Sequence, residues 1–268
     1  MLAIERKNEI LSILQKEQSV LVSDLSQRYR VTEETIRRDL EKLEKEGFVK
    51  KTYGGAVLNE NTNTDLPFKI RERTNKSEKM AIANQITELV AEGESIVMDS
   101  SSTSLMAAKI LKHYKNLTVV TNSVEILLEM SGNKGIHLIC TGGAMRDSAL
   151  SLGGKIAENT LLNFNVDKAI MSCKGIDMQK GITDSNEFEA NLKTIMARCA
   201  TEIIWLVDSS KFGRVNFVKI MDFRPGDRIV SEKVPDGNWL DFFREQNVRF
   251  VCAEDASRVD KRTAAGGE

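Results

Sequence analysis

Residues 75–254 alternate between short apolar runs and helical stretches, and this alternation constrains the fold more than any other feature of the sequence. Apolar runs occur at 95–98, 117–121, 136–140, 167–172, 202–207, 228–231 and 248–252, and helical patterns at about 77–91, 104–115, 124–131, 155–162 and 187–200. Strands that alternate with helices predict a mainly parallel sheet covered by helices. We therefore expect an α/β domain in this part of the chain.

The first 58 residues follow a different pattern, in which three short helices precede two β-prone runs. Apolar residues near the N-terminus predict a first helix, and Ser23 with Asp24 is expected to cap a second. Thr32 is expected to cap a third helix, which Gly47 is placed to end. Residues 48–58 contain two β-prone runs around a Gly-Gly pair and predict a hairpin. Three helices followed by a hairpin are typical of a winged helix-turn-helix.

The segment between the two patterns is polar and ends in Pro67, which is typical of a linker. The last residues are small and polar, and they are predicted to form a disordered tail. The expected organisation is a winged helix-turn-helix DNA-binding domain over 1–58, a linker and lead-in over 59–74, an α/β effector-sensing domain over 75–254 and a tail over 255–268.

Composition excludes several classes of protein. With 41% hydrophobic and 29% charged residues among 268, the chain has the make-up of an ordinary globular protein, and its length suits two domains of about 150 residues. The apolar run Ile203–Val207 is far too short to span a membrane, which takes about 20 residues. The N-terminus lacks the apolar stretch of a secretory signal, so we expect a cytoplasmic location.

Cysteine and histidine usage argues against a metal centre. The four cysteines lie far apart and form no C-x-x-C pair, and neither histidine has a neighbouring ligand at metal spacing. We therefore expect reduced thiols, no metal site and no cofactor.

Bulk charge does not indicate a nucleic-acid binder, because 38 basic and 39 acidic residues leave a net charge of −1. A DNA-binding interpretation must therefore rest on local arrangement. On a helical wheel, Ile36, Leu40 and Leu43 share one face of the third predicted helix. Arg38 and Lys42 lie on the opposite half, where they are expected to face outward.

A helix that presents hydroxyl and guanidinium groups outward suits a major groove, and lysines on the wing suit phosphates. The alternative is a surface helix whose charges are merely solvated, because glutamates interrupt the basic face. The candidate DNA-binding residues from this pattern are Ser23, Thr32, Thr35, Arg37, Arg38, Lys42, Lys50 and Lys51.

Polar clusters follow five of the predicted strands, at the point where each strand ends. If the strands are parallel, all five clusters lie at one edge of the sheet, where open α/β sheets bind ligands. Hydroxyls and N–H groups before a helix suit a phosphate, and carboxylates or amides suit sugar hydroxyls. Each cluster alone is also explained as a helix cap or a tight turn. The candidate effector-binding residues are Asp99, Ser100, Ser101, Ser102, Thr103, Thr121, Asn122, Gly142, Gly143, Arg146, Lys174, Asp208 and Lys211.

The stretch Thr32–Leu43, with Gly47 and the sequence YGGA at 53–56, resembles the DeoR family of bacterial transcription regulators. The family's hallmark is similar to V-[ST]-x-x-T-[IV]-R-R-D-L-x-x-L-x-x-x-G followed by H-G-G-A. This chain carries Tyr53 where the family usually has histidine. The resemblance implies double-stranded operator DNA as a partner and adds Tyr53 to the candidate DNA contacts.

Residues 68–251 are similar to the C-terminal sensor domain of the same family. The motifs that carry the similarity are Phe68, Arg71, Asn75, Lys79, Thr121-Asn122-Ser123, Gly142-Gly143 with Arg146, Gly175-Ile176, Glu189-Ala190 with Lys193, and Asp208-Ser209-Ser210-Lys211-Phe212-Gly213. The resemblance implies a fold like that of ribose-5-phosphate isomerase and coenzyme A transferases, a phosphorylated sugar as effector, and Glu189 as a further effector-binding residue. Where the family commonly has D-x-G-T-T, this chain has DSSST at 99–103, and Ser172 replaces a frequent glycine.

The leading hypothesis is a transcriptional regulator, expected to repress a carbohydrate uptake or catabolism operon. A phosphorylated sugar would modulate its DNA binding, and the chain would act as a homo-oligomer on repeated half-sites. The alternative is a sugar-phosphate isomerase-like enzyme with an appended DNA-binding module, in which Asp99, Glu189 and Lys174 or Lys211 supply acid and base groups. A generic DNA-compacting protein fits poorly with so low a net charge.

Overall fold

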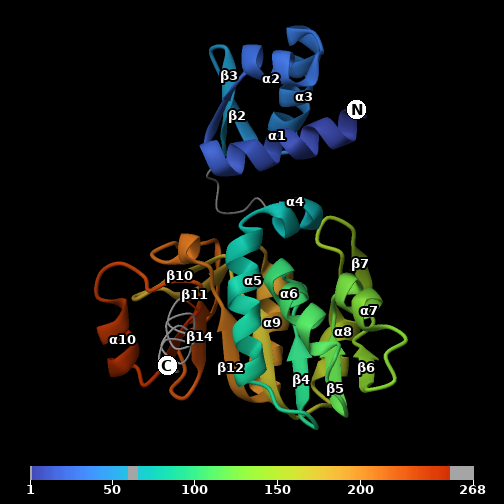
Figure 1. The fold of residues 1–268 in the computed structure, drawn as a ribbon, viewed down its shortest axis with the longest axis vertical. Helices are drawn as coiled ribbons and strands as arrows, with labels where there is room; N and C mark the ends of the chain where they lie inside the picture. Colours follow the sequence, from blue (N-terminus) through green and yellow to red (C-terminus); the bar gives the residue numbers. More distant parts are fainter. Residues whose placement is uncertain (1, 60–65, 254–268) are drawn as a thin grey trace, which may run out of the picture. The chain divides into compact units, whose positions relative to one another are not determined.

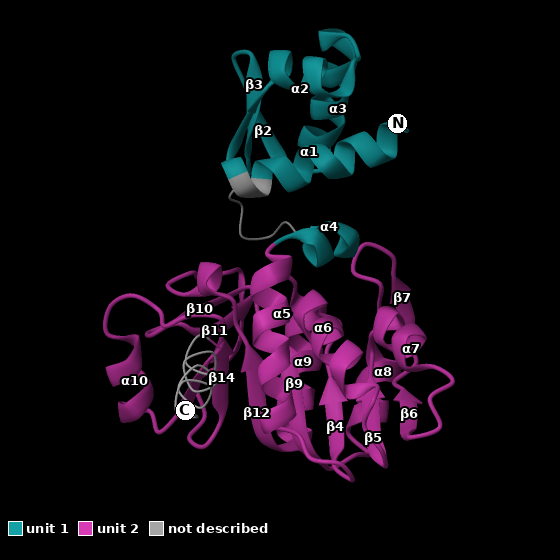
Figure 2. Cartoon of the chain, in the orientation of Figure 1, with its two compact units in different colours: residues 1–74 teal, residues 75–268 magenta. Residues whose placement is uncertain are grey.

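A computed structural model describes residues 2–59 and 66–253 of the chain (Figure 1). The chain divides between Thr74 and Asn75 into two compact units, which are coloured separately in Figure 2. The tail expected over 255–268 and residues 60–65 of the expected linker lie outside the described residues.

The first unit contains three helices of the kind that the sequence predicts: α1 (Ala3–Glu17), α2 (Val22–Tyr29) and α3 (Glu33–Lys45). Their apolar faces form one core, in which Ile36, Leu40 and Leu43 are fully buried. Thr32 caps α3, because its hydroxyl accepts a hydrogen bond from the Thr35 backbone N–H at 3.3 Å. Gly47 follows the helix with φ +81°, the left-handed conformation in which glycine ends helices.

The cap expected for α2 is wrong. The helix begins at Val22, directly after a strand, and its preceding residue Leu21 makes no side-chain cap. The Val22 N–H donates instead to the Gly54 carbonyl oxygen at 2.8 Å, and the Ser23 hydroxyl donates to Asp24 at 3.0 Å. A tertiary contact therefore satisfies the helix end that the sequence pattern assigned to a local side chain.

The wing is a three-stranded antiparallel sheet in the order β1-β3-β2, made of β1 (Ser19–Leu21), β2 (Val49–Thr52) and β3 (Gly55–Leu58). The hairpin was predicted, but its turn is Tyr53-Gly54, and Gly55 already belongs to β3. A Cβ on Gly55 would lie 2.0 Å from the Val20 carbonyl oxygen, so the close approach of β1 requires this glycine. The three-residue β1 was not predicted. Helix α4 (Phe68–Arg73) completes the first unit.

The second unit is built on a seven-stranded parallel sheet in the order β15-β14-β12-β9-β4-β5-β6. Its strands are β4 (Ser95–Met98), β5 (Leu117–Thr121), β6 (Ile136–Cys140), β9 (Val166–Ser172), β12 (Ala200–Leu206), β14 (Arg228–Ser231) and β15 (Arg249–Cys252). All seven apolar runs of the sequence are strands of this one sheet, which confirms the predicted fold class. The strand order reverses between β4 and β9, so a topological switch point lies there.

Helices connect the strands (Figure 1). They are α5 (Lys76–Asn84) with the 3₁₀ turn Gln85–Glu88, α6 (Ser102–Leu111), α7 (Val124–Met130), α8 (Lys155–Leu161), α9 (Glu187–Cys199) and α10 (Trp239–Glu245). The first five correspond to predicted helices, whereas α10 was not predicted. Within residues 2–59 and 66–253, no helix is long and apolar enough to cross a membrane.

Two small antiparallel elements accompany the large sheet, and neither was predicted. A hairpin of β7 (Ala144–Arg146) and β8 (Ser151–Gly153) follows β6. A second sheet contains β10 (Gly175–Asp177), β11 (Gly181–Asp184) and β13 (Val218–Met221). Both bring side chains to the edge of the large sheet where its strands end, as shown below.

Candidate DNA-binding face and candidate effector-binding edge

Helix α3 presents a basic face outward, as its periodicity predicts. Arg37, Arg38 and Lys42 are exposed, while the apolar stripe of the same helix is buried. Each arginine forms an ion pair with a glutamate one turn earlier: Arg37 with Glu33 at 2.6 Å and Arg38 with Glu34 at 3.2 Å. These pairs are largely exposed, and such pairs are worth at most about 1 kcal/mol. DNA phosphates or bases can therefore displace the glutamates at little cost.

The remaining candidates surround this helix. Ser23 and Thr32 are exposed at the starts of α2 and α3, and the Thr35 hydroxyl lies 2.9 Å from that of Thr32. On the wing, Lys50 is exposed and Tyr53 at the turn is fully exposed, at 107% of its reference surface. The other wing lysine, Lys51, is paired with Glu41 at 3.1 Å and lies 3.9 Å from Glu44, both on α3. This exposed ion pair connects the wing to the helix and, like the arginine pairs, contributes little energy.

One polar residue of the helix has a structural role that sequence reasoning missed. Asp39 is 3% exposed and forms a 2.5 Å ion pair with Arg6 of α1, which is 7% exposed. The pair joins the first and third helices inside the first unit, which is called the head below. The helical wheel of α3 indicates this buried position only weakly. It places Asp39 near the apolar stripe, but it does not identify a partner 33 residues away in the sequence.

In the second unit, the five polar clusters do lie at one edge of the sheet, because the strands that precede them are all parallel. Asp99, at the end of β4, is the centre of this edge and is 1% exposed. Its Oδ1 accepts hydrogen bonds from Ser101 and Ser104, which order the start of α6. Its Oδ2 accepts from the Ser172 backbone N–H at 3.1 Å, across the switch point.

A buried lysine completes this centre. Lys193 of α9 lies 3.3 Å from Asp99 and 2.6 Å from Asp184 at the end of β11, and its Nζ also donates to the Ser172 carbonyl oxygen. Burial by itself lowers the pKa of Lys193, but Asp184, Asp99 and Glu189 outweigh that effect and hold it above its ordinary value. The ammonium therefore stays charged, and Lys193 is unsuited to act as a base.

A second lysine bridges the ends of β9 and β12. Lys211 donates to the Ser172 hydroxyl at 2.8 Å and lies 3.3 Å from Asp208. Burial by itself raises the pKa of Asp208, but Lys211 and the Ser210 hydroxyl lower it to about 2. Asn75 also donates to Asp208, at 3.3 Å. The serine that replaces a frequent family glycine thus supplies a contact for Lys211.

A third charged cluster involves the β7–β8 hairpin. Glu189, in the first turn of α9, accepts hydrogen bonds from Arg146 of β7, from the Ser151 hydroxyl of β8 at 2.7 Å and from the Ser100 hydroxyl at 3.1 Å. Asn122 at the end of β5 is held by the same hairpin, because its side-chain Nδ2 donates to the Leu152 carbonyl oxygen. These bonds attach the hairpin to two elements of the edge, α9 and the end of β5.

The remaining candidates lie at the same edge. Ser102 and Thr103 begin α6, and Ser101 is its N-cap. Gly143 has φ +109°, and a Cβ there would lie 2.4 Å from the Gly153 carbonyl oxygen, so the turn into the hairpin requires glycine. Gly142 and Thr121 lie beside it at the ends of β6 and β5, whereas Lys174 is only half-buried, between β9 and β10.

Sequence reasoning missed Asp184 and Ser151 as members of the edge. Both sit at the ends of short strands that carry no recognisable pattern, so nothing local indicated that they would reach it. Lys193 was noted only as part of a motif. Within the described ranges, no group of three or more possible metal ligands occurs.

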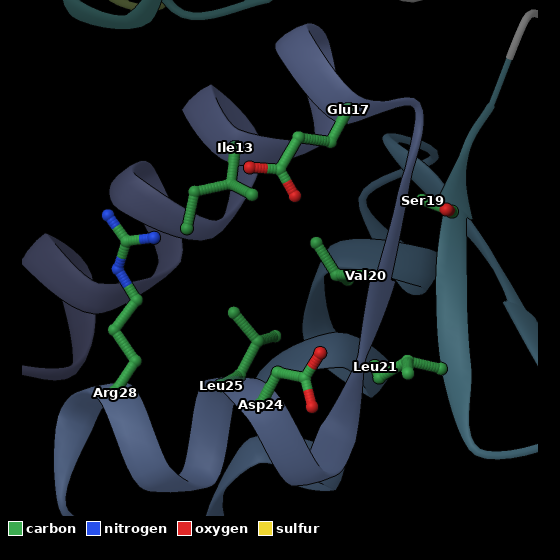
Figure 3. Close-up of a pocket in the computed structure, with 8 residues that line it drawn as sticks. All are labelled: Ile13, Glu17, Ser19, Val20, Leu21, Asp24, Leu25 and Arg28. Carbon is green, nitrogen blue, oxygen red and sulfur yellow. The ribbon is translucent and has the colours of Figure 1, made fainter.

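A separate pocket of about 250 Å³ lies in the first unit (Figure 3). It is lined by residues of α1, β1 and α2: Ile13, Glu17, Ser19, Val20, Leu21, Asp24, Leu25 and Arg28. It includes none of the candidate DNA-binding residues and none of the effector edge.

Comparisons with known proteins agree with the division of the chain. Residues 6–62 match the model of the DeoR-like helix-turn-helix domain, and residues 74–233 match that of the DeoR C-terminal sensor domain. The chain is 41% identical over 252 residues to the uncharacterized HTH-type transcriptional regulator YulB of Bacillus subtilis, covering 94% of this chain and 97% of that protein. It is 32% identical to the L-fucose operon activator of Haemophilus influenzae, covering 92% and 98%, and 30% identical to the transcriptional repressor AccR of Agrobacterium fabrum, covering 87% and 93%.

Proposed function

The chain belongs to the DeoR family of HTH-type transcriptional regulators, and from this premise we propose how its two units divide the work. The first unit binds operator DNA through α3 and the wing. The second unit binds a phosphorylated sugar at the strand-end edge, and this effector changes the affinity for DNA. The regulated genes serve carbohydrate uptake or catabolism, and the basal effect is repression.

The exposed arginines of α3 support the assignment of DNA contacts. Arg37 and Arg38 are reachable from solvent and are held only by weak pairs, so they suit base edges in a major groove. Lys50 and Tyr53 lie exposed on the wing, where they suit phosphates and the sugar backbone. Ser23, Thr32, Thr35, Lys42 and Lys51 complete the proposed surface.

The single observation that carries the effector proposal is the gathering of cations and hydroxyls at one sheet edge, over the switch point. Arg146, Lys211 and the N-terminus of α6 suit an anion, while Asp208 and Asn122 suit sugar hydroxyls. The name of the Haemophilus relative, an L-fucose operon activator, supports a sugar-related signal. Repression is supported by the name of the Agrobacterium relative.

The active species is proposed to be a homo-oligomer. Residues 1–57 carry 11 basic and 10 acidic side chains, a net charge of +1, so one head has little electrostatic attraction for DNA. Two or more heads on repeated half-sites multiply the affinity without new contacts.

The same edge is poorly suited to catalysis. Lys193 remains protonated, Asp208 remains ionised, and burial raises the pKa of the neighbouring Cys173 thiol to about 12. Lys193 and Asp208 therefore keep fixed charges and the Cys173 thiol stays neutral, whereas a general acid or base must change its protonation state. The relatives named above are regulators as well. We therefore propose no reaction for this edge.

DNA binding by the full-length chain tests this function. Promoter fragments from the chain's own genomic neighbourhood are titrated in a fluorescence anisotropy assay, alone and with phosphorylated sugars or their unphosphorylated counterparts. Arg38→Ala is expected to weaken specific binding roughly tenfold or more, since a bidentate base contact contributes about 1–3 kcal/mol. Arg198→Ala, at an exposed arginine of α9, is the charge-matched control. If no fragment binds in any condition, the proposed function is wrong.

A further inference from the structure

The Glu189 carboxylate is bound as a ligand would be. Its two oxygens accept hydrogen bonds from Arg146, Ser151 and Ser100, which come from β7, β8 and the loop after β4. All three donors therefore share this one carboxylate. Glu189 itself is 8% exposed, so water does not replace the contacts.

This donor set is the kind that recognises an oxyanion. A guanidinium with two hydroxyls offers several convergent N–H and O–H groups, and arginine favours planar or tetrahedral anions that accept more than one bond. Nearby, Ser101 caps the N-terminus of the ten-residue helix α6, which adds favourable potential for negative charge. A phosphate would satisfy the same donors and would carry more charge than a carboxylate.

The Glu189 cluster differs from the buried lysine centre beside it. Around Lys193, the side chains of Lys193, Asp99 and Asp184 are only 7%, 1% and 2% exposed, so that centre is closed to solutes. In the second cluster the side chains of Arg146 and Glu189 are 22% and 10% exposed. An incoming anion can therefore reach Arg146 first, and it reaches the buried hydroxyls of Ser100 and Ser151 only when Glu189 leaves them.

We propose that Glu189 is an internal competitor of the effector: it occupies the anion-binding groups Arg146, Ser100 and Ser151, and the effector's phosphate displaces it. This inference rests on the anionic effector proposed above and deepens it by assigning the phosphate position. Displacement detaches the β7–β8 hairpin from α9 and attaches it to the ligand. The effector thus shifts the protein between two arrangements, because it binds only the one in which Glu189 has left.

The proposal predicts that substitutions at the two partners of this ion pair change the affinity for an anion in opposite directions. Removing the charge of Glu189 removes the competitor, so an anion binds more tightly. Removing the charge of Arg146 removes the binding group, so the anion binds more weakly. A pair that only stabilised the hairpin would give both variants the same sign.

The test measures binding of inorganic phosphate to the full-length chain, from the rise in melting temperature at constant ionic strength. Glu189→Gln is expected to lower the apparent dissociation constant of phosphate roughly tenfold relative to the unmodified chain, and Arg146→Gln to raise it roughly tenfold, the scale of one charged hydrogen bond. Glu187→Gln is the control, because it removes the same charge from an exposed position in the same turn of α9.

Weaker or unchanged phosphate binding by Glu189→Gln would overturn the proposal, as would an equal gain in Glu187→Gln. If Glu189→Gln, or a second variant Glu189→Ala, melts at a lower temperature than the unmodified chain, phosphate is expected to raise the melting temperature of that variant again. If phosphate does not raise it, the proposal is wrong. The outcomes separate this inference from the proposed function. Suppose that a phosphorylated sugar changes operator binding of the unmodified chain, but Glu189→Gln binds phosphate more weakly. These two results together refute only the role of Glu189 as a competitor and leave the proposed function standing.

Discussion

The buried Arg6–Asp39 pair gives the sharpest prediction about the DNA-binding head. The substitution Asp39→Asn keeps the size of the side chain and removes its charge, which leaves the Arg6 guanidinium uncompensated. Both side chains are less than a tenth exposed and the atoms lie 2.5 Å apart, so solvent cannot replace the lost carboxylate. Breaking a buried pair in this way costs about 3–5 kcal/mol.

That cost is large for a domain of this size. A unit of 74 residues, at roughly 0.05–0.15 kcal/mol per residue, has a free energy of unfolding of about 4–11 kcal/mol. The substitution is therefore expected to raise the unfolded fraction of the head by two to three orders of magnitude, at about 1.4 kcal/mol per factor of ten. The second unit contains neither partner and is expected to keep its stability.

Amide hydrogen exchange of the full-length chain, followed by mass spectrometry, resolves the two units. Protection of α1 and α3 is expected to fall about 100-fold or more, while β9 and β12 keep theirs. The control is Glu34→Gln, which removes an exposed pair on the same helix and is expected to cost less than about 1 kcal/mol. If Asp39→Asn loses no more protection in α1 and α3 than Glu34→Gln does, the argument from burial is wrong.

Three further predictions follow from particular sites. In chemical denaturation, Gly143→Ala is expected to lower the free energy of unfolding by about 1–3 kcal/mol more than Gly93→Ala. Both glycines have positive φ, but only at Gly143 would the new Cβ lie 2.4 Å from a carbonyl oxygen, that of Gly153. Equal losses would contradict this reasoning. The pKa of Asp208, lowered from 3.8 to about 2, contributes roughly 2 kcal/mol of stability that is present above about pH 4 and lost between pH 4 and 2. The stability difference between Asp208→Asn and the unmodified chain should therefore shrink over that range, and a constant difference would refute the assignment. Lys50→Ala is expected to reduce the salt dependence of operator binding by about one unit of log–log slope per bound head, with similar effects on different operator sequences; a sequence-selective loss would show that Lys50 contacts bases.

The strand-end edge of the large sheet shows which features the sequence could not predict. Polar residues after β4, β5, β6, β9 and β12 were predicted to meet, because parallel strands end at the same side of a sheet. Which of them touch was not predictable. Asp99 binds Lys193 and Ser172 rather than facing outward, and Glu189 holds a hairpin that the sequence did not reveal.

The amino-acid sequence alone determined the elements whose signals are local. The buried stripe of α3, its Thr32 cap and the seven apolar strands all arise from spacings of a few residues, since helix and strand periodicity is a property of neighbouring positions. The tertiary structure alone decided the pairs that join distant segments, such as Arg6 with Asp39 and Arg146 with Glu189. It also decided the short strands β1, β7 and β8, which exist because a partner strand satisfies their backbone groups. Charge partners and edge strands depend on what the fold brings near, and no local pattern contains that information.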